Sequence, residues 1–547
     1  MPSTSGPASS GRRTLLKTVL AGASVLSASA LLEACGAQPS GKASAGAAAT
    51  AGADTGKQIA LLRVALPGSL SNLYPGQESG ILNYIVAGIC MEGLFGVDPS
   101  GQLVPGLATK VRKAGAKRYV YTIRSNARFQ DGSPVTVADI LYSIERARDT
   151  AASPSTAAYW ADLDTAEQTG DHEITLTSKS GDESFVWLPS NADALWVLPK
   201  STWQKAEGRI GTASALPLGS GPYKVTDFAP DSHVELERVD TWWGTAPKAA
   251  RIRFDFIPDD NTRLLAWKAG KADLALNVPP AAFRQWESAP RTRVVYSPDR
   301  SYVGLTFNTS VKPFDDAHVR KAIAHAVDRQ AIVRDILRGH GAVATALSTP
   351  EQFGGLWSSA EATRRLAAVP QYDYSLDEAR RELAESSVPK GFTTSISYPD
   401  TGPQLGTAAL ALAADLKKIG ITLHVEELPI EQWLSRLGTH PGLGYMWYFN
   451  TTGDPGELAS WLLGADNPAR YTNRRVTTLL TEAGTESDPA KRAELLIQAQ
   501  SAQAADVAYA PLWWGRSAVA LTDAVGLKDY TSYTLLGEWP SRVYAAK

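Results

Sequence analysis

Few residues in this 547-residue chain are spaced for covalent chemistry. The sequence contains no GxSxG, HExxH or phosphate-loop motif, and its seven histidines are scattered. His318 and His325 share one face of a predicted helix, but no third metal ligand is spaced to complete a site with them. The adjacent acids Asp259 and Asp260 are more typical of a solvated surface than of a catalytic pair. We therefore expect no catalytic residues, no cofactor and no metal site, so that a secreted enzyme is the minority interpretation.

Length, composition and charge restrict the remaining classes of protein. A chain of 547 residues is too long for one hydrophobic core, which predicts at least two packed lobes. Hydrophobic residues make up 44% of the chain, with 15 Trp, 19 Tyr and 12 Phe, as in a globular protein. The formal charge of -2 leaves no basic excess to neutralise phosphates, so no nucleic acid is expected as a partner.

The first 34 residues have the pattern of a signal peptide. Arg12 and Arg13 precede an uncharged run, Thr18 to Leu32, that is too short to span a bilayer comfortably. The order from Gly11 to Lys17 resembles a twin-arginine export motif, although general secretion stays open. We expect the protein to be exported.

Cys35 follows the apolar run directly. The order Leu32-Glu33-Ala34-Cys35-Gly36 looks like a lipobox, in which Cys35 becomes the lipidated first residue of the mature protein. Residues 35–57 are then rich in Ala, Gly, Ser and Thr, which predicts a flexible linker. The other cysteine, Cys90, lies in an apolar stretch of helical period, and we expect it in the core.

Alternating and periodic segments predict an α/β protein. Leu216 to Trp243 reads as a glycine- and proline-rich turn followed by a hairpin. Thr136 and Asp139 form a capping box for a helix over 137–148. A second helix is expected over 317–338, and a strand, helix and strand over 393–425, a unit typical of mainly parallel sheets. Other expected strands include 61–66, 119–123, 172–178, 251–257 and 302–308.

Three strings carry a resemblance to a known family. They are the PxGSGPY…WWG pattern within 217–244, FQDGSPVT at 129–136, and PFDDAHVRKAIAHAVDRQAIV at 313–333. Each resembles the corresponding string of the extracytoplasmic solute-binding proteins of oligopeptide-type ABC importers, bacterial family 5. The resemblance covers nearly all of residues 60–515.

The resemblance implies a two-lobe periplasmic-binding-protein-like fold of type II. This is an α/β architecture of the large cluster, with an extra subdomain and mixed sheets flanked by helices. The chain is expected to begin with a signal peptide (1–34) and a lipidated cysteine with its linker (35–57). Lobe I is expected to consist of three separate segments (58–100, 216–304 and 515–547) and an inserted subdomain (101–215), and lobe II of one segment (305–514).

The implied function is capture of a small solute by lobe closure and its delivery to a membrane permease. A peptide is the first ligand that the family suggests. Sugars, opines and metal chelates stay open as alternatives, as does a structural surface lipoprotein. The implied location is the outer face of the cytoplasmic membrane, where the protein is held by the lipid on Cys35 and acts as a monomer.

The resemblance also places a ligand cleft near residues 445–455. Peptide binders of this family carry an Asp four residues before the proline that aligns with Pro455, where it pairs with the ligand amine. That position is Thr451 here, whose hydroxyl cannot neutralise an ammonium group. Asp454 either substitutes for it or serves the turn before proline. The cleft candidates, of which the aromatic ones read equally as core, are Tyr445, Trp447, Tyr448, Asn450, Thr451 and Asp454.

Overall fold

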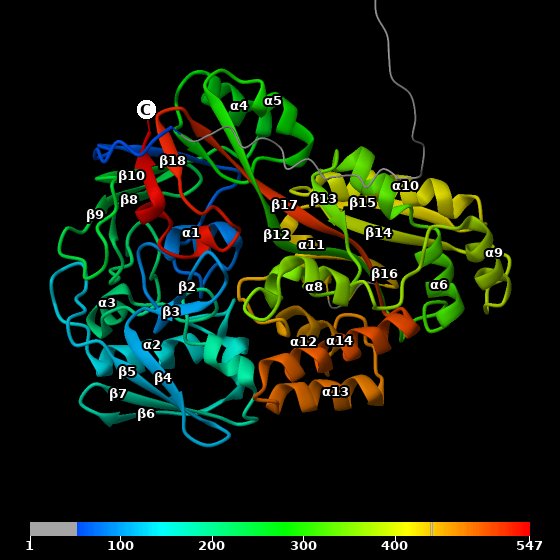
Figure 1. Cartoon of the computed structure of the whole chain (residues 1–547), viewed down its shortest axis with the longest axis horizontal. Helices are drawn as coiled ribbons and strands as arrows, with labels where there is room; N and C mark the ends of the chain where they lie inside the picture. Colours follow the sequence, from blue (N-terminus) through cyan, green and yellow to red (C-terminus); the bar gives the residue numbers. More distant parts are fainter. Residues whose placement is uncertain (1–51, 438, 440, 547) are drawn as a thin grey trace, which may run out of the picture. The chain divides into compact units, whose positions relative to one another are not determined.

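A computed structural model describes residues 52–437, 439 and 441–546 of the chain (Figure 1). The predicted signal peptide, Cys35 and most of the predicted linker lie outside these residues. Within the described residues, no helix has both the length and the apolar character needed to cross a membrane.

The largest sheet has nine strands and is mixed, which confirms the predicted class of fold. Only β1 pairs in parallel, with β10 and β11, and the other pairs of this sheet are antiparallel. The expected mixed sheets are confirmed, and so is the predicted strand-helix-strand unit, whose strands β14 (Thr393–Pro399) and β15 (Thr422–Leu428) pair in parallel. These two strands form a separate sheet, so they do not make the large sheet mainly parallel. The large sheet has the order β16 (Leu443–Phe449), β12 (Thr292–Phe307), β17 (Tyr509–Thr522), β11 (Leu274–Ala275), β1 (Leu62–Leu66), β10 (Arg251–Phe256), β9 (His233–Arg238) and β8 (Tyr223–Ala229), with β13 (Gly341–Val343) on β17.

Strands β12 and β17 are the longest of the described chain, with 16 and 14 residues, and they run side by side (Figure 1). One end of β17 pairs with β11, whereas the other end of β12 pairs with β16. The register between β12 and β17 shifts between Pro298 and Tyr302. The sequence predicted only the second half of β12 as a strand, and the predicted lobe boundaries after residues 304 and 514 fall inside these two strands.

Separate hydrophobic cores include opposite ends of the two long strands. We call lobe I the region whose core joins β1 and β8–β10 with residues 519–543, and lobe II the region whose core lies within residues 303–513. A third core, the subdomain, packs α2 (Val137–Arg148) on the sheet β4 (Ala108–Lys113), β5 (Arg118–Ile123), β7 (Glu173–Ser178) and β6 (Leu163–Gly170). Cys90 is buried in lobe I, and so are Trp196 and Trp203, which the sequence assigned to the inserted subdomain.

Local signals explain where several helices begin and end. Helix α2 has the predicted bounds because Thr136 and Asp139 form the capping box. The predicted helix over 317–338 is instead interrupted after α6 (Ala317–His325). Asp328 caps a new short helix, α7 (Arg329–Ala331), by accepting a hydrogen bond from the Ala331 amide.

The remaining helices and strands complete the two lobes and the subdomain. They are α1 (Ile81–Ala87), α3 (Lys200–Ala206), α4 (Asp260–Lys268), α5 (Phe283–Glu287), α8 (Ser359–Leu366), α9 (Leu376–Ala384), α10 (Pro403–Lys417), α11 (Ile430–Arg436), α12 (Glu457–Leu463), α13 (Arg474–Thr485), α14 (Pro489–Asp506), β2 (Phe95–Val97), β3 (Leu103–Pro105), β18 (Val525–Leu527) and β19 (Val543–Ala545).

Candidate functional site

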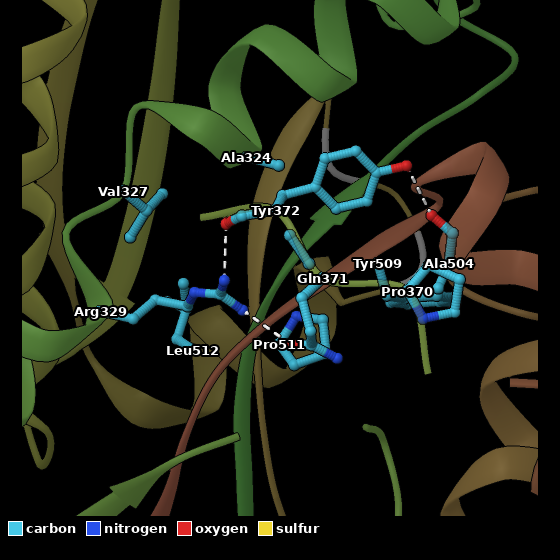
Figure 2. A pocket seen from close by; sticks show the side chains of 11 residues that line it. Ala324, Val327, Arg329, Pro370, Gln371, Tyr372, Ala504, Tyr509, Pro511 and Leu512 are labelled. Carbon is cyan, nitrogen blue, oxygen red and sulfur yellow. Dashed lines mark hydrogen bonds between the residues drawn. The ribbon is translucent and has the colours of Figure 1, made fainter. Parts of the chain in front are cut away.

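A small cavity in lobe II is a packing feature rather than a ligand site (Figure 2). Its volume is about 20 Å³, which suffices for about one water molecule. The polar groups of its wall are already bonded, since Arg329 donates to the Tyr372 carbonyl and the Tyr372 hydroxyl donates to the Ala504 carbonyl. The candidate site therefore lies elsewhere.

Strand β16 carries the predicted aromatic residues, and successive side chains point to opposite faces. Tyr445 is buried in the lobe II core, where its hydroxyl donates to the Leu405 carbonyl at 3.0 Å. Trp447 is half-buried against the same core. Tyr448 packs on the other side of the strand, with the core cluster that contains α12 residues. Of the three aromatic candidates, Tyr445 and Tyr448 both have a hydrogen-bond partner within the protein.

Two other predicted residues are also bonded within the protein. Asn450 is fully buried, and its side-chain amide donates to the Arg300 carbonyl at 2.8 Å. The Asp454 carboxylate is paired with the Arg492 guanidinium at 2.9 Å and accepts the Gly456 amide. These bonds assign both residues to holding the loop after β16, in keeping with the turn interpretation of Asp454.

Glu457, the first residue of α12, places a carboxylate against the loop after β16. It accepts the Thr451 amide at 3.0 Å, the Thr452 amide at 2.9 Å and the Tyr448 hydroxyl at 2.9 Å. Burial raises the pKa of Glu457, while these hydrogen bonds act in the opposite direction. Sequence reasoning missed Glu457 because nothing in the local pattern shows that its side chain folds back over the loop.

A second carboxylate, that of Asp193, approaches Glu457 from the other half of the molecule. Burial, and after it the charges of Glu457 and Asp454, raise the pKa of Asp193 to about 8. The Asp193 backbone carbonyl accepts the Tyr84 hydroxyl at 2.9 Å. Its carboxylate forms no hydrogen bond or ion pair with another described residue.

We call Tyr84, Asp193, Tyr448 and Glu457 the acidic cluster. Tyr84 and Asp193 precede β12 in the chain, whereas Tyr448 and Glu457 belong to lobe II. Burial and the charge of Glu457 raise the pKa of both tyrosines, which places all four side chains in one electrostatic environment. Among the described residues, no Lys or Arg forms an ion pair with either carboxylate of the cluster.

Direct contacts close the two halves of the molecule against each other beside the acidic cluster. The Tyr533 hydroxyl donates to the Thr452 carbonyl at 3.1 Å. Gly453 lies so close to the backbone of Gly101 that an added Cβ would be 2.0 Å from the Gly101 carbonyl oxygen. The loop after β16 is therefore in direct contact with the other half of the molecule.

Two buried carboxylates are chemically suited to attract a cation. Two carboxylates of like charge repel each other in a buried environment, and a positively charged group placed between them relieves that repulsion. The tyrosine rings beside them offer faces that also attract cations. A small molecule with an ammonium group meets both requirements.

Comparison with known proteins agrees with the fold and with a binding role. The model of "Bacterial extracellular solute-binding proteins, family 5 Middle" matches residues 102–469, well over half of the chain. The chain belongs to this family, the substrate-binding proteins of ABC importers. Its relatives are binding proteins and not enzymes.

Two curated relatives share about a quarter of their residues with the chain. Glutathione-binding protein GsiB of Escherichia coli strain K12 is 24% identical over 453 residues, which cover 80% of this chain and 85% of GsiB. Heme-binding protein A of Haemophilus influenzae is 26% identical over 353 residues, and the match spans 62% of each protein.

Solved structures of the same architecture show the fold. DppA from Helicobacter pylori, in complex with the peptide STSA, has a TM-score of 0.77 at 23% identity and covers 90% of this chain and 99% of DppA. AgaA from A. tumefaciens R10, in complex with agropinic acid, has a TM-score of 0.76 at 22% identity and covers 89% of this chain and 99% of AgaA.

Proposed function

We propose that the protein captures a small solute with a positively charged amine between its lobes and delivers it to an ABC permease. A short peptide is the first candidate. The observation that carries the proposal is the acidic cluster, in which the charge of Glu457 acts on Asp193 from the other half and neither carboxylate forms an ion pair with a described Lys or Arg. The names of two similar proteins support peptides, since one is a glutathione-binding protein and the other was solved with a peptide.

Free and N-acetylated trialanine test this proposal by isothermal titration calorimetry. Acetylation removes the positive charge of the amine and leaves the rest of the peptide unchanged. We expect acetylation to weaken binding about 10- to 100-fold, the usual contribution of a hydrogen bond to a charged group. Equal affinity for the two forms would contradict the proposal, and no binding of either form would exclude short peptides as the solute.

An amine-bearing opine is the second candidate, because Thr451 replaces the carboxylate of the peptide binders that the chain resembles. AgaA, which has the same fold, was solved with agropinic acid. In the same titration, such an opine would bind and trialanine would not. Asp193 and Glu457 would serve the amine of either ligand.

We also propose that the protein acts as a monomer tethered by a lipid on Cys35 after removal of its leader. The described chain begins on lobe I, where Thr55 donates to the Ala545 carbonyl at 2.9 Å and Lys528 pairs with Asp54 at 2.8 Å. Lobe I is therefore the half next to the tether. We expect Cys35→Ala to move the protein from the membrane fraction to the soluble fraction on immunoblots. Unchanged membrane association would argue against the lipid.

A further inference from the structure

Arg300 is a buried cation with one unused donor group. It lies in β12 within the shift of register between Pro298 and Tyr302, and only 3% of the residue is exposed. Its Nε donates to the Ser532 hydroxyl at 3.1 Å, and Nη2 donates to the Ser532 carbonyl at 3.0 Å. Nη1 is buried and has no hydrogen-bond partner among the described residues. A buried N–H group without a partner is costly for a folded protein.

The guanidinium of Arg300 lies beside the loop that holds the acidic cluster. Its Cζ is 4.0 Å from the centre of the Tyr533 ring, and the hydroxyl of the same ring bonds to the Thr452 carbonyl. The backbone carbonyl of Arg300 accepts the Asn450 side chain. Burial lowers the pKa of Arg300, and the charges of Glu457 and Asp299 act in the opposite direction, so the guanidinium lies within reach of the charge of the acidic cluster.

None of the acids near Arg300 forms a hydrogen bond with Nη1, and this includes Glu351, whose pKa is raised by burial while the charge of Arg300 acts in the opposite direction. Asp299 binds the amide and the hydroxyl of Ser301 instead. Glu457 binds the loop amides and the Tyr448 hydroxyl. A guanidinium stays protonated at any physiological pH, so the unused N–H group remains a donor with a positive charge. An anion is the natural partner of such a group.

We propose that Nη1 of Arg300 binds an anionic group of the solute, such as a carboxylate, while the acidic cluster binds its amine. The inference rests on the proposed function and narrows the solute to molecules that carry both charges. Arg300 bonds lobe I through Ser532 and lobe II through Asn450. An anion held by Arg300 therefore favours the closed arrangement in which both sets of bonds are made.

Trialanine and its C-terminal amide test this inference, since amidation removes only the negative charge. We expect the wild-type protein to bind the amide about 10- to 100-fold more weakly than the acid in calorimetry. Arg300→Met should bind both forms equally, with the weak affinity of the amide. Arg300→Lys keeps the positive charge but loses the planar guanidinium with its several N–H donors. This variant should therefore discriminate less between the acid and the amide than the wild type does.

Arg263→Met is the matched control for the loss of a buried arginine. Arg263 is fully buried in α4 and bonds to Asp260 and to the Ile257 carbonyl, away from the acidic cluster. We expect this variant to be destabilised but to discriminate between acid and amide as the wild type does. If Arg300→Met does not fold, the ratio of affinities for acid and amide is compared between Arg300→Lys and the wild type.

The outcomes separate this inference from the proposed function. Equal binding of acid and amide by the wild type, or unchanged discrimination by the Arg300 variants, would overturn the anion anchor and leave the amine site standing. If neither form bound the wild type, the proposed function would fail for peptides, and the inference would fail with it.

Discussion

Asp193→Asn is expected to stabilise the unliganded protein and, at the same time, to weaken binding of trialanine about 100-fold. The substitution removes a carboxylate whose ionised form is disfavoured by burial and by the charge of Glu457. It also removes one of the two negative charges that the ligand amine would meet. A residue that only supported the fold would not change stability and affinity in opposite directions.

The pH dependence of the free energy of unfolding shows why Asp193→Asn should stabilise the protein. The pKa of Asp193 is about 8 in the folded protein, against an ordinary value of 3.8. A raised carboxyl pKa lowers stability as pH rises from about 4 to about 8, because the unfolded chain releases its proton first. The gain from Asp193→Asn should therefore be absent near pH 4 and reach about 2 kcal/mol near pH 8, after allowance for solvent screening. Urea unfolding at several pH values measures it.

Binding has its own pH dependence, which runs in the opposite sense. The ammonium of the peptide binds the ionised form of Asp193, so wild-type affinity for trialanine should rise about tenfold per pH unit between about pH 6 and pH 8. Calorimetry of Asp193→Asn should show a flat profile over the same range. A wild-type profile without slope would contradict the role of Asp193.

Glu92→Gln is the matched control for Asp193→Asn. Glu92 is buried in lobe I, where burial raises its pKa to about 8 and its carboxylate accepts the Trp243 indole N–H at 3.0 Å. The amide of Gln can accept the same bond. We expect the variant to gain stability above about pH 5 and to bind trialanine like the wild type. A loss of affinity equal to that of Asp193→Asn would show that removal of any buried acid has this effect.

Gly453→Ala is expected to weaken binding about 10- to 100-fold by holding the lobes apart. The added Cβ would lie 2.0 Å from the Gly101 carbonyl oxygen and 3.2 Å from the Trp187 ring. Backbone cannot move aside as a flexible side chain does, so the contact between the halves must open. The clash is with the other half of the molecule, and each half should keep its own fold.

Small-angle X-ray scattering and calorimetry measure the two consequences of this substitution. With trialanine present, the radius of gyration of Gly453→Ala should exceed that of the wild type. Gly96→Ala is the control, since a Cβ at Gly96 meets only ordinary contacts, at 3.7 Å and beyond. If Gly453→Ala had the same affinity for trialanine and the same radius of gyration as the wild type, closure through this contact would not be needed for binding.

Much of the fold could be predicted from local signals. The capping box at Thr136 set the bounds of α2, and the alternation of Ile252, Phe254 and Phe256 predicted the buried face of β10. Local patterns did not reveal the full length of β12, because its first half is only partly buried and pairs with residues far along the chain. The new cap at Asp328 was also missed within an otherwise continuous helical pattern.

The candidate site was only partly predictable. The sequence indicated the loop after β16, but it did not indicate which residues from other parts of the chain contact that loop. Because successive side chains of a strand point to opposite faces, Tyr445 and Tyr448 lie on different faces of β16, and this could be predicted from the sequence. The influence of the Glu457 charge on Asp193 could not be predicted, because the two residues lie far apart in the chain and only the tertiary fold brings them within reach of each other. The same holds for the unused donor of Arg300.

A thermal-shift screen of the purified protein tests the central claim most directly, namely that an amine-bearing solute is held between the closed lobes. The panel contains trialanine, N-acetyl-trialanine, opines, sugars and chelated metals. Stabilisation should reach about 2.7 kcal/mol at a ligand concentration of 100 Kd, for solutes with a free amine only, and should be lost in Asp193→Asn. Stabilisation by a sugar or a metal chelate, with no effect of any free amine, would contradict the account.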